Sequence, residues 1–223
     1  SKFRAMQLAV LRLRLTDGAP SALTMTYQGE LYGHGFVTGG CAIFRNSLFT
    51  GAAGGATPYE VWGLLALHCK NVEEVMKLTR DYPVDQSFHT TVSDEQGNII
   101  GIEYGPTGSA FLKPKRSIYV HANAVVSGKK LMKYERDQTY FHRAESLNRE
   151  TRLRQLLESN NGRLSVQIAF SGLADHAGYP VSVCRHQAIE AMTGAAVIAE
   201  PTKNMIHVVR GPVCQNWPRT YRL

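Results

Sequence analysis

The sequence predicts an α+β fold in which helices are layered on antiparallel sheets, and three observations predict it. Apolar and polar residues alternate in many short segments, which is typical of strands with one buried face. Helical segments occur as two pairs, so the order is strands, two helices, strands, two helices, strands. A parallel, doubly wound sheet would instead need strict alternation of strands and helices.

Strands are expected first, at residues 6–15, 22–27 and 41–49. Residues 6–15 alternate in polarity over their second half, and Asp17-Gly18-Ala19-Pro20 is a turn. Residues 29–40 are rich in glycine, but no helical pattern follows them as it would in a dinucleotide-binding loop. We interpret these glycines as tight turns and close backbone approach.

Two helices are predicted next. Pro58 suits the first turn of a helix that runs to about Cys69. Asn71 is expected to cap a second helix, Val72 to Arg80, because acidic residues occupy the first turn, where the helix dipole favours them.

The second half repeats this grouping, and the long helix ends where Asn160-Asn161-Gly162 breaks its pattern. After residue 209 an irregular tail is expected. The predicted elements are a hairpin of residues 88–93 and 99–104, strands 109–112 and 117–122, helices 140–158 and 164–173, and strands 181–185, 195–199 and 205–209.

The composition is that of a globular protein, with 43% hydrophobic and 19% charged residues among 223. We expect a single domain over residues 1–223 that needs no metal ion or disulfide to hold its core. The apolar runs are shorter than the ~20 residues that span a bilayer, so no membrane contact is expected. The cysteines form no CxxC pair and no histidines have metal-ligand spacing, so we expect reduced thiols, no metal site and a cytoplasmic location.

Basic residues concentrate between Lys113 and Arg154. This segment has eleven Lys and Arg and four acidic residues, which accounts for the whole net charge of +7. It could attract nucleic acid or a phosphate-bearing cofactor, or it could be a solvated face. Few aromatic residues are interleaved as base-stacking platforms, so nucleic-acid binding is not expected.

Catalytic signatures that can be recognised from spacing alone are absent: there is no HExxH, P-loop or GxSxG pattern. Asp175 and His176 are an acid and a base side by side, but neighbours in a loop seldom face each other. The residues by themselves therefore lead to an α+β domain with a basic face.

Eight short motifs occur in order over nearly the whole chain. They are Thr26–Gly29 with Gly33–Phe36, Asn46–Leu48, Leu65–Leu78, Gly101–Pro106, Val120–Asn123, Ser146–Arg152, Asp175–His186, and Gly211–Pro212 with Tyr221. In this order the chain resembles the isopenicillin N acyltransferase family, a branch of the N-terminal nucleophile hydrolases that includes acyl-CoA:6-aminopenicillanic acid acyltransferase-like proteins.

The resemblance implies a four-layer αββα sandwich of two antiparallel sheets between helix layers. It implies a precursor that cleaves itself to expose an N-terminal cysteine, whose thiol attacks a small-molecule amide or thioester while the α-amine acts as base. No cofactor is implied. The propeptide or N-terminal fragment of the same precursor is an expected partner, and assembly into a homo-oligomer is left open.

The resemblance also implies site residues. Asn123 matches the family's oxyanion asparagine; a turn or strand-end role is the alternative. Asn46 is expected to be a second polar contact and Arg149 to orient the nucleophile end, with structural roles as alternatives. Tyr27 and His121 are expected to bind substrate.

Two departures from the family bear on function. The nucleophilic cysteine and its strand belong upstream of Met6, and Ser1 would come too late in the fold to replace it. Met192-Thr193 and Gly105 stand where the penicillin-forming member has a Ser-Arg pair and a serine, which argues against penicillin synthesis. The alternative function is a catalytically inactive protein that binds a ligand through the basic face.

Overall fold

The computed structural model describes residues 7–14, 20–48, 54, 57–105, 108–128, 131, 140–186 and 191–223. The expectations for Ser1, for Pro106 and for the basic residues at 129, 130, 133 and 136 lie outside these residues.

Seven strands form the larger sheet, and each is antiparallel to the next along the chain. Short connections join most of these neighbours, and strands joined by tight turns pair with each other; β4 and β5 also pair, although α2 and α3 lie between them in the chain. The strands are β1 (Leu8–Arg14), β2 (Ser21–Tyr27), β3 (His34–Val37), β4 (Cys41–Ser47), β5 (Phe88–Asp94), β6 (Ile99–Gly105) and β7 (Gly108–Leu112).

The smaller sheet has three antiparallel strands near the C-terminus. They are β8 (Ala195–Glu200), β9 (Met205–Arg210) and β10 (Arg219–Arg222), with β9 in the centre. The 3₁₀ turns η1 (Pro201–Lys203) and η2 (Val213–Gln215) lie beside these strands.

Four helices occur among the described residues, in the two expected pairs. They are α2 (Tyr59–Ala66), α3 (Val72–Asp81), α5 (Tyr140–Glu158) and α6 (Val166–Leu173). The amide of Glu74 donates to Asn71 Oδ1 at 2.9 Å, so Asn71 caps α3 as predicted. Pro58 is the residue just before α2 rather than its first helical residue.

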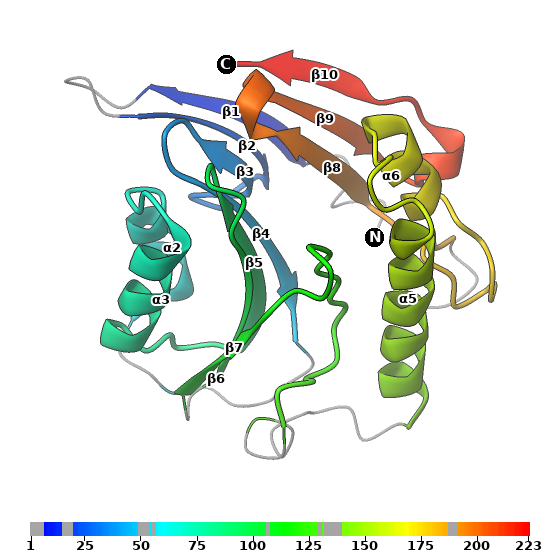
Figure 1. Ribbon diagram of the computed structural model, residues 1–223, viewed down its shortest axis with the longest axis horizontal. Helices are drawn as coiled ribbons and strands as arrows, with labels where there is room; N and C mark the ends of the chain where they lie inside the picture. Colours follow the sequence, from blue (N-terminus) through cyan, green and yellow to red (C-terminus); the bar gives the residue numbers. More distant parts are fainter. Residues whose placement is uncertain are drawn as a thin grey trace.

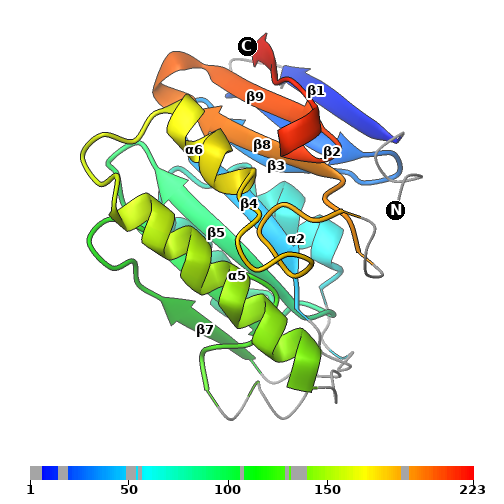
Figure 2. The ribbon, with the colours of Figure 1, turned by 90° about the vertical axis from the view of Figure 1, so that its right-hand side faces the viewer.

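The layers follow the order α2 and α3, larger sheet, smaller sheet, α6 (Figure 1). Trp62 and Val75 bury one face of the larger sheet, and Phe36 and Ile206 pack between the sheets. Phe170 packs α6 on the outer face of the smaller sheet. Figure 2 shows α5 crossing in front of the half of the larger sheet that the smaller sheet leaves open. The predicted α+β sandwich is confirmed.

Glycines allow β2 and β3 to approach closely, as expected for residues 29–40. A Cβ on Gly33 would lie 1.9 Å from the carbonyl oxygen of Met25, and one on Gly35 would lie 2.0 Å from that of Leu23. Both positions exclude any larger residue.

Two predicted strands are wrong for one physical reason. Residues 117–122 and 181–185 form no strand, because side chains and loop backbone from elsewhere take the hydrogen bonds that a neighbouring strand would provide. Arg154 donates to the carbonyl of Val120 at 3.0 Å, and Thr193 Oγ1 accepts from the amide of Arg185 at 2.9 Å. The tail prediction is also wrong, because part of it forms β10.

The four cysteines are free thiols; Cys41, Cys69 and Cys184 are buried and Cys214 is exposed. None of the described helices combines the length and apolar character that would let it cross a membrane.

Candidate active site

Three polar residues lie side by side on the inner face of the larger sheet, which is the face turned away from α2 and α3. In the strand register Asn46 on β4 is opposite His89 on β5, and His89 is opposite Glu103 on β6. Alternation along each strand directs their apolar neighbours, such as Ile43 and Ile102, into the core beneath α2 and α3. The register thus places these three polar residues in a row, on the face opposite that core.

His89 is the centre of this row and is fully buried. Its Nδ1 lies 2.7 Å from Asn46 Oδ1, which can only accept, so Nδ1 carries the hydrogen. Its Nε2 then accepts from the hydroxyl of Tyr119 at 2.8 Å. Burial, followed by the neighbouring His121, lowers the pKa of His89 well below its ordinary value of 6.5. The ring is therefore neutral at physiological pH.

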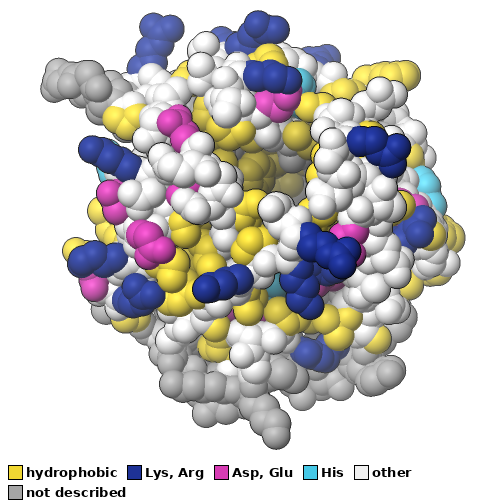
Figure 3. Space-filling model, in the orientation of Figure 1, with side chains coloured by type: hydrophobic (Ala, Val, Ile, Leu, Met, Phe, Trp, Pro, Cys, Tyr) yellow, Lys and Arg dark blue, Asp and Glu magenta, His cyan; other side chains and the backbone are white. Residues whose placement is uncertain are grey.

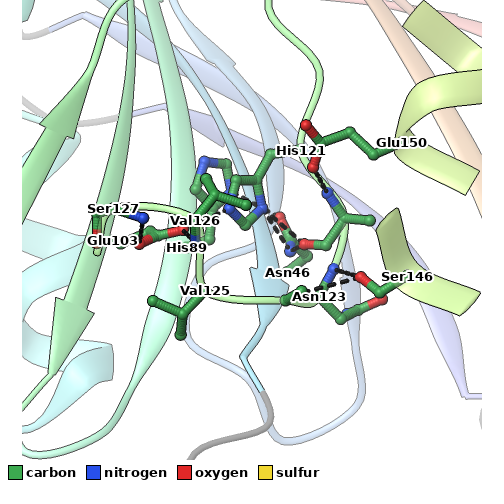
Figure 4. A network of polar contacts seen from close by, with 12 residues as sticks. Asn46, His89, Glu103, His121, Asn123, Val125, Val126, Ser127, Ser146 and Glu150 are labelled. Carbon is green, nitrogen blue, oxygen red and sulfur yellow. Dashed lines mark hydrogen bonds and ion pairs between the residues drawn. The ribbon is translucent and has the colours of Figure 1, made fainter. Parts of the chain in front are cut away.

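His121 stacks on His89, with ring centroids 3.6 Å apart and an angle of 5° between planes. Its Nε2 lies 2.8 Å from Glu103 Oε1 and its Nδ1 lies 2.7 Å from the carbonyl oxygen of Ala122. Asn46 Nδ2 donates to the same carbonyl (Figure 4). The polar row thus holds residues 121 and 122 in place.

Glu103 is a fully buried carboxylate that organises the next part of this segment. It accepts from the backbone amides of Val126 and Ser127 at 2.8 and 3.0 Å. Burial opposes its ionisation, but hydrogen bonds from His121, Ser127 and Val126 outweigh burial and lower the pKa of Glu103 below its ordinary 4.5. The ionised carboxylate anchors the chain on both sides of Asn123.

Asn123 sits between β4 and α5 (Figure 4), and four hydrogen bonds hold it and the neighbouring Ala124. Its backbone amide and that of Ala124 donate to the buried Ser146 Oγ at 2.7 and 2.9 Å. Its side-chain Nδ2 donates to the carbonyl of Ser47 at 2.8 Å, and its Oδ1 accepts from Arg149 at 2.9 Å. An asparagine amide has two N–H donors, and within the described part of the chain only the Ser47 contact uses one of them.

Arg149 belongs to a charged cluster on the inner side of α5. Its guanidinium pairs with Glu145, one helical turn earlier, and Arg185 pairs with the same buried carboxylate. Burial lowers the pKa of Arg149 to about 10, so it remains a cation at neutral pH. A cation fixed by Glu145 thereby fixes the orientation of the Asn123 amide.

A cavity of about 270 Å³ adjoins these residues. Residues 120–122, Arg149 and Glu150 line one side, and apolar side chains of α5, α6 and β8 line the other. Figure 3 shows the molecule hollowed between the larger sheet and α5, with hydrophobic side chains in the hollow. The cavity combines apolar walls with a fixed cation, Arg149, and the fixed amide of Asn123 contacts that cation.

The structure brings four of the five expected site residues together: Asn46, His121, Asn123 and Arg149. The hydroxyl of Tyr27 lies near Gly194, where a Cβ would be 3.7 Å away. Gly194 precedes β8, beside the cavity lining. The expected roles of all five residues stay predictions.

Sequence reasoning did not single out His89, Glu103, Ser146 or Glu145. Glu103 had a signal: it is the one charged residue in the otherwise apolar run Ile99–Tyr104. A buried charge at that position requires partners. Ser146 begins the motif Ser146–Arg152 but was given no role there, and His89 carried no signal, because its importance depends on which residues lie opposite it.

The part of the basic face that lies on α5 is engaged in contacts within the protein. On α5, Arg143 donates to the carbonyl of Val125 at 3.1 Å, Arg152 pairs with Asp175 at 2.7 Å and Arg154 pairs with Glu150 at 3.0 Å. None of the four α5 arginines, which include Arg149, is a freely solvated charge. They hold α5 against neighbouring segments.

Comparison with known proteins adds the following findings. A sequence profile described as acyl-coenzyme A:6-aminopenicillanic acid acyl-transferase matches residues 48–206. No curated protein sequence matches. The fold is similar to that of penicillin V acylase from Agrobacterium tumefaciens, with a TM-score of 0.57 and 11% identity over 86% of this chain. That alignment covers 66% of the acylase, just under two thirds of its length.

A second solved structure is a variant of conjugated bile acid hydrolase from Clostridium perfringens. It has a TM-score of 0.58 and 12% identity, covering 97% of this chain and 89% of the hydrolase. Another mutant of that hydrolase has a TM-score of 0.57 and 12% identity, covering 92% and 82%. Identities this low show a shared fold.

Proposed function

Because the chain belongs to the acyl-coenzyme A:6-aminopenicillanic acid acyl-transferase family, we propose that it acts as an amide hydrolase or acyltransferase on a linear C–N amide. The nucleophile is an N-terminal cysteine in a segment of the precursor that precedes Ser1. One observation carries this proposal: the side-chain amide of Asn123 is fixed by Ser47 and Arg149, next to Ala122 and Arg149, which line a largely apolar cavity.

The proposed reaction passes through an acyl-enzyme. The cysteine thiol adds to the substrate carbonyl and its proton passes to the α-amine, whose ordinary pKa of about 8 suits it as a base. The tetrahedral intermediate collapses as the C–N bond breaks, and the leaving amine takes the proton. Water or an acceptor amine then cleaves the thioester and frees the thiol.

Asn123 is assigned to stabilise the oxyanion of the tetrahedral intermediate. Such a donor is effective when it is fixed before the reaction. Arg149 and Ser146 supply this fixation from α5, so they are positioning residues in our proposal. Asn46 has the same role, because its amide is occupied by the carbonyl of Ala122 and by His89.

The free edge of β8 offers a place for the N-terminal segment. Among the described strands β8 pairs with β9 alone. Consecutive residues Ala195, Ala196 and Val197 all line the cavity, although neighbouring side chains of a strand point to opposite faces. The cavity therefore meets an edge of β8, and a strand paired there would carry its first residue into the site.

The complete gene, expressed in its natural form, tests this proposal. Intact mass and N-terminal peptide mapping should show a mature chain that begins with cysteine upstream of Ser1. A thiol-reactive acyl donor should leave an acyl adduct on that residue. We expect Asn123→Ala to lower kcat by about 10²- to 10³-fold, the cost of removing one oxyanion donor.

Asn161→Ala is the matched control, because Asn161 is exposed beyond the end of α5. It should leave kcat unchanged. A complete protein that begins at Ser1, or Asn123→Ala with undiminished turnover, would contradict the proposal.

The second candidate, an inactive protein that binds a ligand through its basic face, is less well supported. The α5 arginines already have internal partners, while Lys113, Lys115 and Arg116 are exposed. Ligand binding without turnover in the complete protein, abolished by substituting those three residues, would favour this candidate.

A further inference from the structure

Two histidines and two cysteines converge outside the candidate active site. The sulfur atoms of Cys184 and Cys214 are 3.8 Å apart, and His186 Nε2 lies 3.2 Å from Cys214 Sγ. His176 Nε2 lies 2.9 Å from His186 Nε2. All four donor atoms lie within 4.8 Å of one another, and no other group among the described residues has this metal-binding geometry.

These distances approach the edges of a zinc tetrahedron. With Zn–S bonds of about 2.3 Å and Zn–N bonds of about 2.0 Å, the ideal edges are about 3.8 Å for S–S, 3.5 Å for S–N and 3.3 Å for N–N. The Cys184–Cys214 separation equals the ideal value. The His186–Cys214 and His176–His186 separations must lengthen by about 0.3 and 0.4 Å to reach the ideal values.

Local hydrogen bonds bring the first three donors together. The amide of Ala177 donates to Asp175 Oδ1 at 3.1 Å, which turns the chain beyond α6 and presents His176. The amide of Cys184 donates to the carbonyl of Asp175 at 3.0 Å, which closes the loop from 175 to 184. Cys214 approaches from η2, 30 residues farther along the chain.

The donor set identifies the metal. Tetrahedral sites with two sulfur and two nitrogen ligands are typical of zinc. Cys184 is fully buried, whereas His176 and Cys214 are exposed, so an ion can enter from solvent. The charged neighbours Arg185 and Asp175 are turned to other partners, Glu145 and Arg152, so neither competes for the four donors.

We propose that His176, Cys184, His186 and Cys214 form a structural zinc site. Four protein ligands complete the tetrahedron and leave no open position, which distinguishes structural from catalytic zinc. The ion would tie the loop after α6 to the C-terminal segment around η2. The same loop carries Arg185, whose ion pair with Glu145 also supports Arg149, so the ion would stabilise the active-site side of α5.

The site differs from what the sequence predicts, because the ligands are dispersed. His176 and His186 are 10 residues apart and His186 and Cys214 are 28 apart, a spacing unlike that of compact zinc motifs. Only the fold brings them together.

Metal analysis of the full chain, purified without a histidine tag or chelator, tests the proposal. Elemental analysis should find about one zinc ion per chain. Cobalt added to chelator-treated protein should give the visible bands of a tetrahedral ion and a thiolate-to-cobalt charge-transfer band. Removing a residue that hydrogen-bonds to a metal ligand lowers metal affinity by about 10- to 100-fold. Removing a ligand itself, in Cys214→Ser or His186→Asn, should therefore lower the zinc affinity by more than about 100-fold.

Cys69→Ser and His68→Asn are the matched controls, because both residues lie outside the cluster. Both should keep full zinc content. The proposal is overturned if the native chain binds neither zinc nor cobalt, if the ligand variants bind zinc as tightly as the controls do, or if intact mass shows a Cys184–Cys214 disulfide in place of a metal. None of these outcomes depends on enzymatic activity.

Discussion

Glu103 illustrates how single residues organise the site. Its side chain is inaccessible to solvent, yet it is ionised, because three donors surround it: His121 and the amides of Val126 and Ser127. These contacts extend from the strand β6 to the segment that carries Asn123. Its negative charge is therefore both a structural support and the reason that the segment has one defined conformation.

Glu103→Gln should lower the free energy of unfolding by about 1–3 kcal/mol. The amide is similar in shape but replaces charge-assisted hydrogen bonds with weaker ones, and its NH₂ group cannot accept. Urea denaturation at neutral pH measures the difference. Glu73→Gln, at an exposed position in α3, should change it by less than about 0.5 kcal/mol. Equal effects from both variants would contradict the assigned role of Glu103.

Asn123 and Arg149 were chosen from the sequence by resemblance, and the structure places them in contact. The residues around them were not predicted. Ser146 and His89 are ordinary polar residues in a helix and a strand pattern. Ser146 contacts Asn123, 23 positions away, and His89 contacts Asn46, 43 positions away. Such contacts arise from strand register and helix docking, which local patterns do not specify.

At the scale of elements, α3 and α5 were predicted most accurately. The capping residue Asn71 and the break at residues 160–162 are local signals, and the helix bounds of Val72–Asp81 and Tyr140–Glu158 follow from them. The strand predictions at 117–122 and 181–185 failed, because β patterning is realised only when another strand lies alongside.

Asn71→Ala should lower the free energy of unfolding by about 1 kcal/mol, the usual cost of losing a side-chain cap. It leaves the amide of Glu74 without its acceptor. Chemical denaturation provides the measurement. Lys77→Ala, which removes an exposed ion pair in the same helix, should cost less than about 0.5 kcal/mol. A cap variant no less stable than the Lys77 variant would show that Asn71 does not stabilise α3.

Across the whole molecule, two histidines lie on the inner face of the larger sheet. Burial, followed by the nearby Arg45, lowers the pKa of His34 from 6.5 to about 4. Burial and then His121 lower the pKa of His89 in the same direction. Both rings stay neutral in the folded protein at pH values where the unfolded chain binds protons.

The free energy of unfolding should therefore fall as the pH falls from about 6.5 towards 4, because the unfolded state binds more protons there. Denaturation curves between about pH 7 and pH 4.5 measure this slope, above the range of most carboxylates. His34→Gln should give a shallower slope than the native protein. His68→Gln, at an exposed position, should leave the slope unchanged. Parallel slopes for the native chain and the His34 variant would contradict the prediction.

The amino-acid sequence alone determined the fold class, the helix ends and most strands, because these depend on residues within a few positions of one another. The tertiary structure alone decided the site. It set the register that aligns Asn46, His89 and Glu103, and it gathered His176, Cys184, His186 and Cys214. Both groups contain residues that are far apart in the chain, so the interactions within each group form only once the sheets and helices have packed.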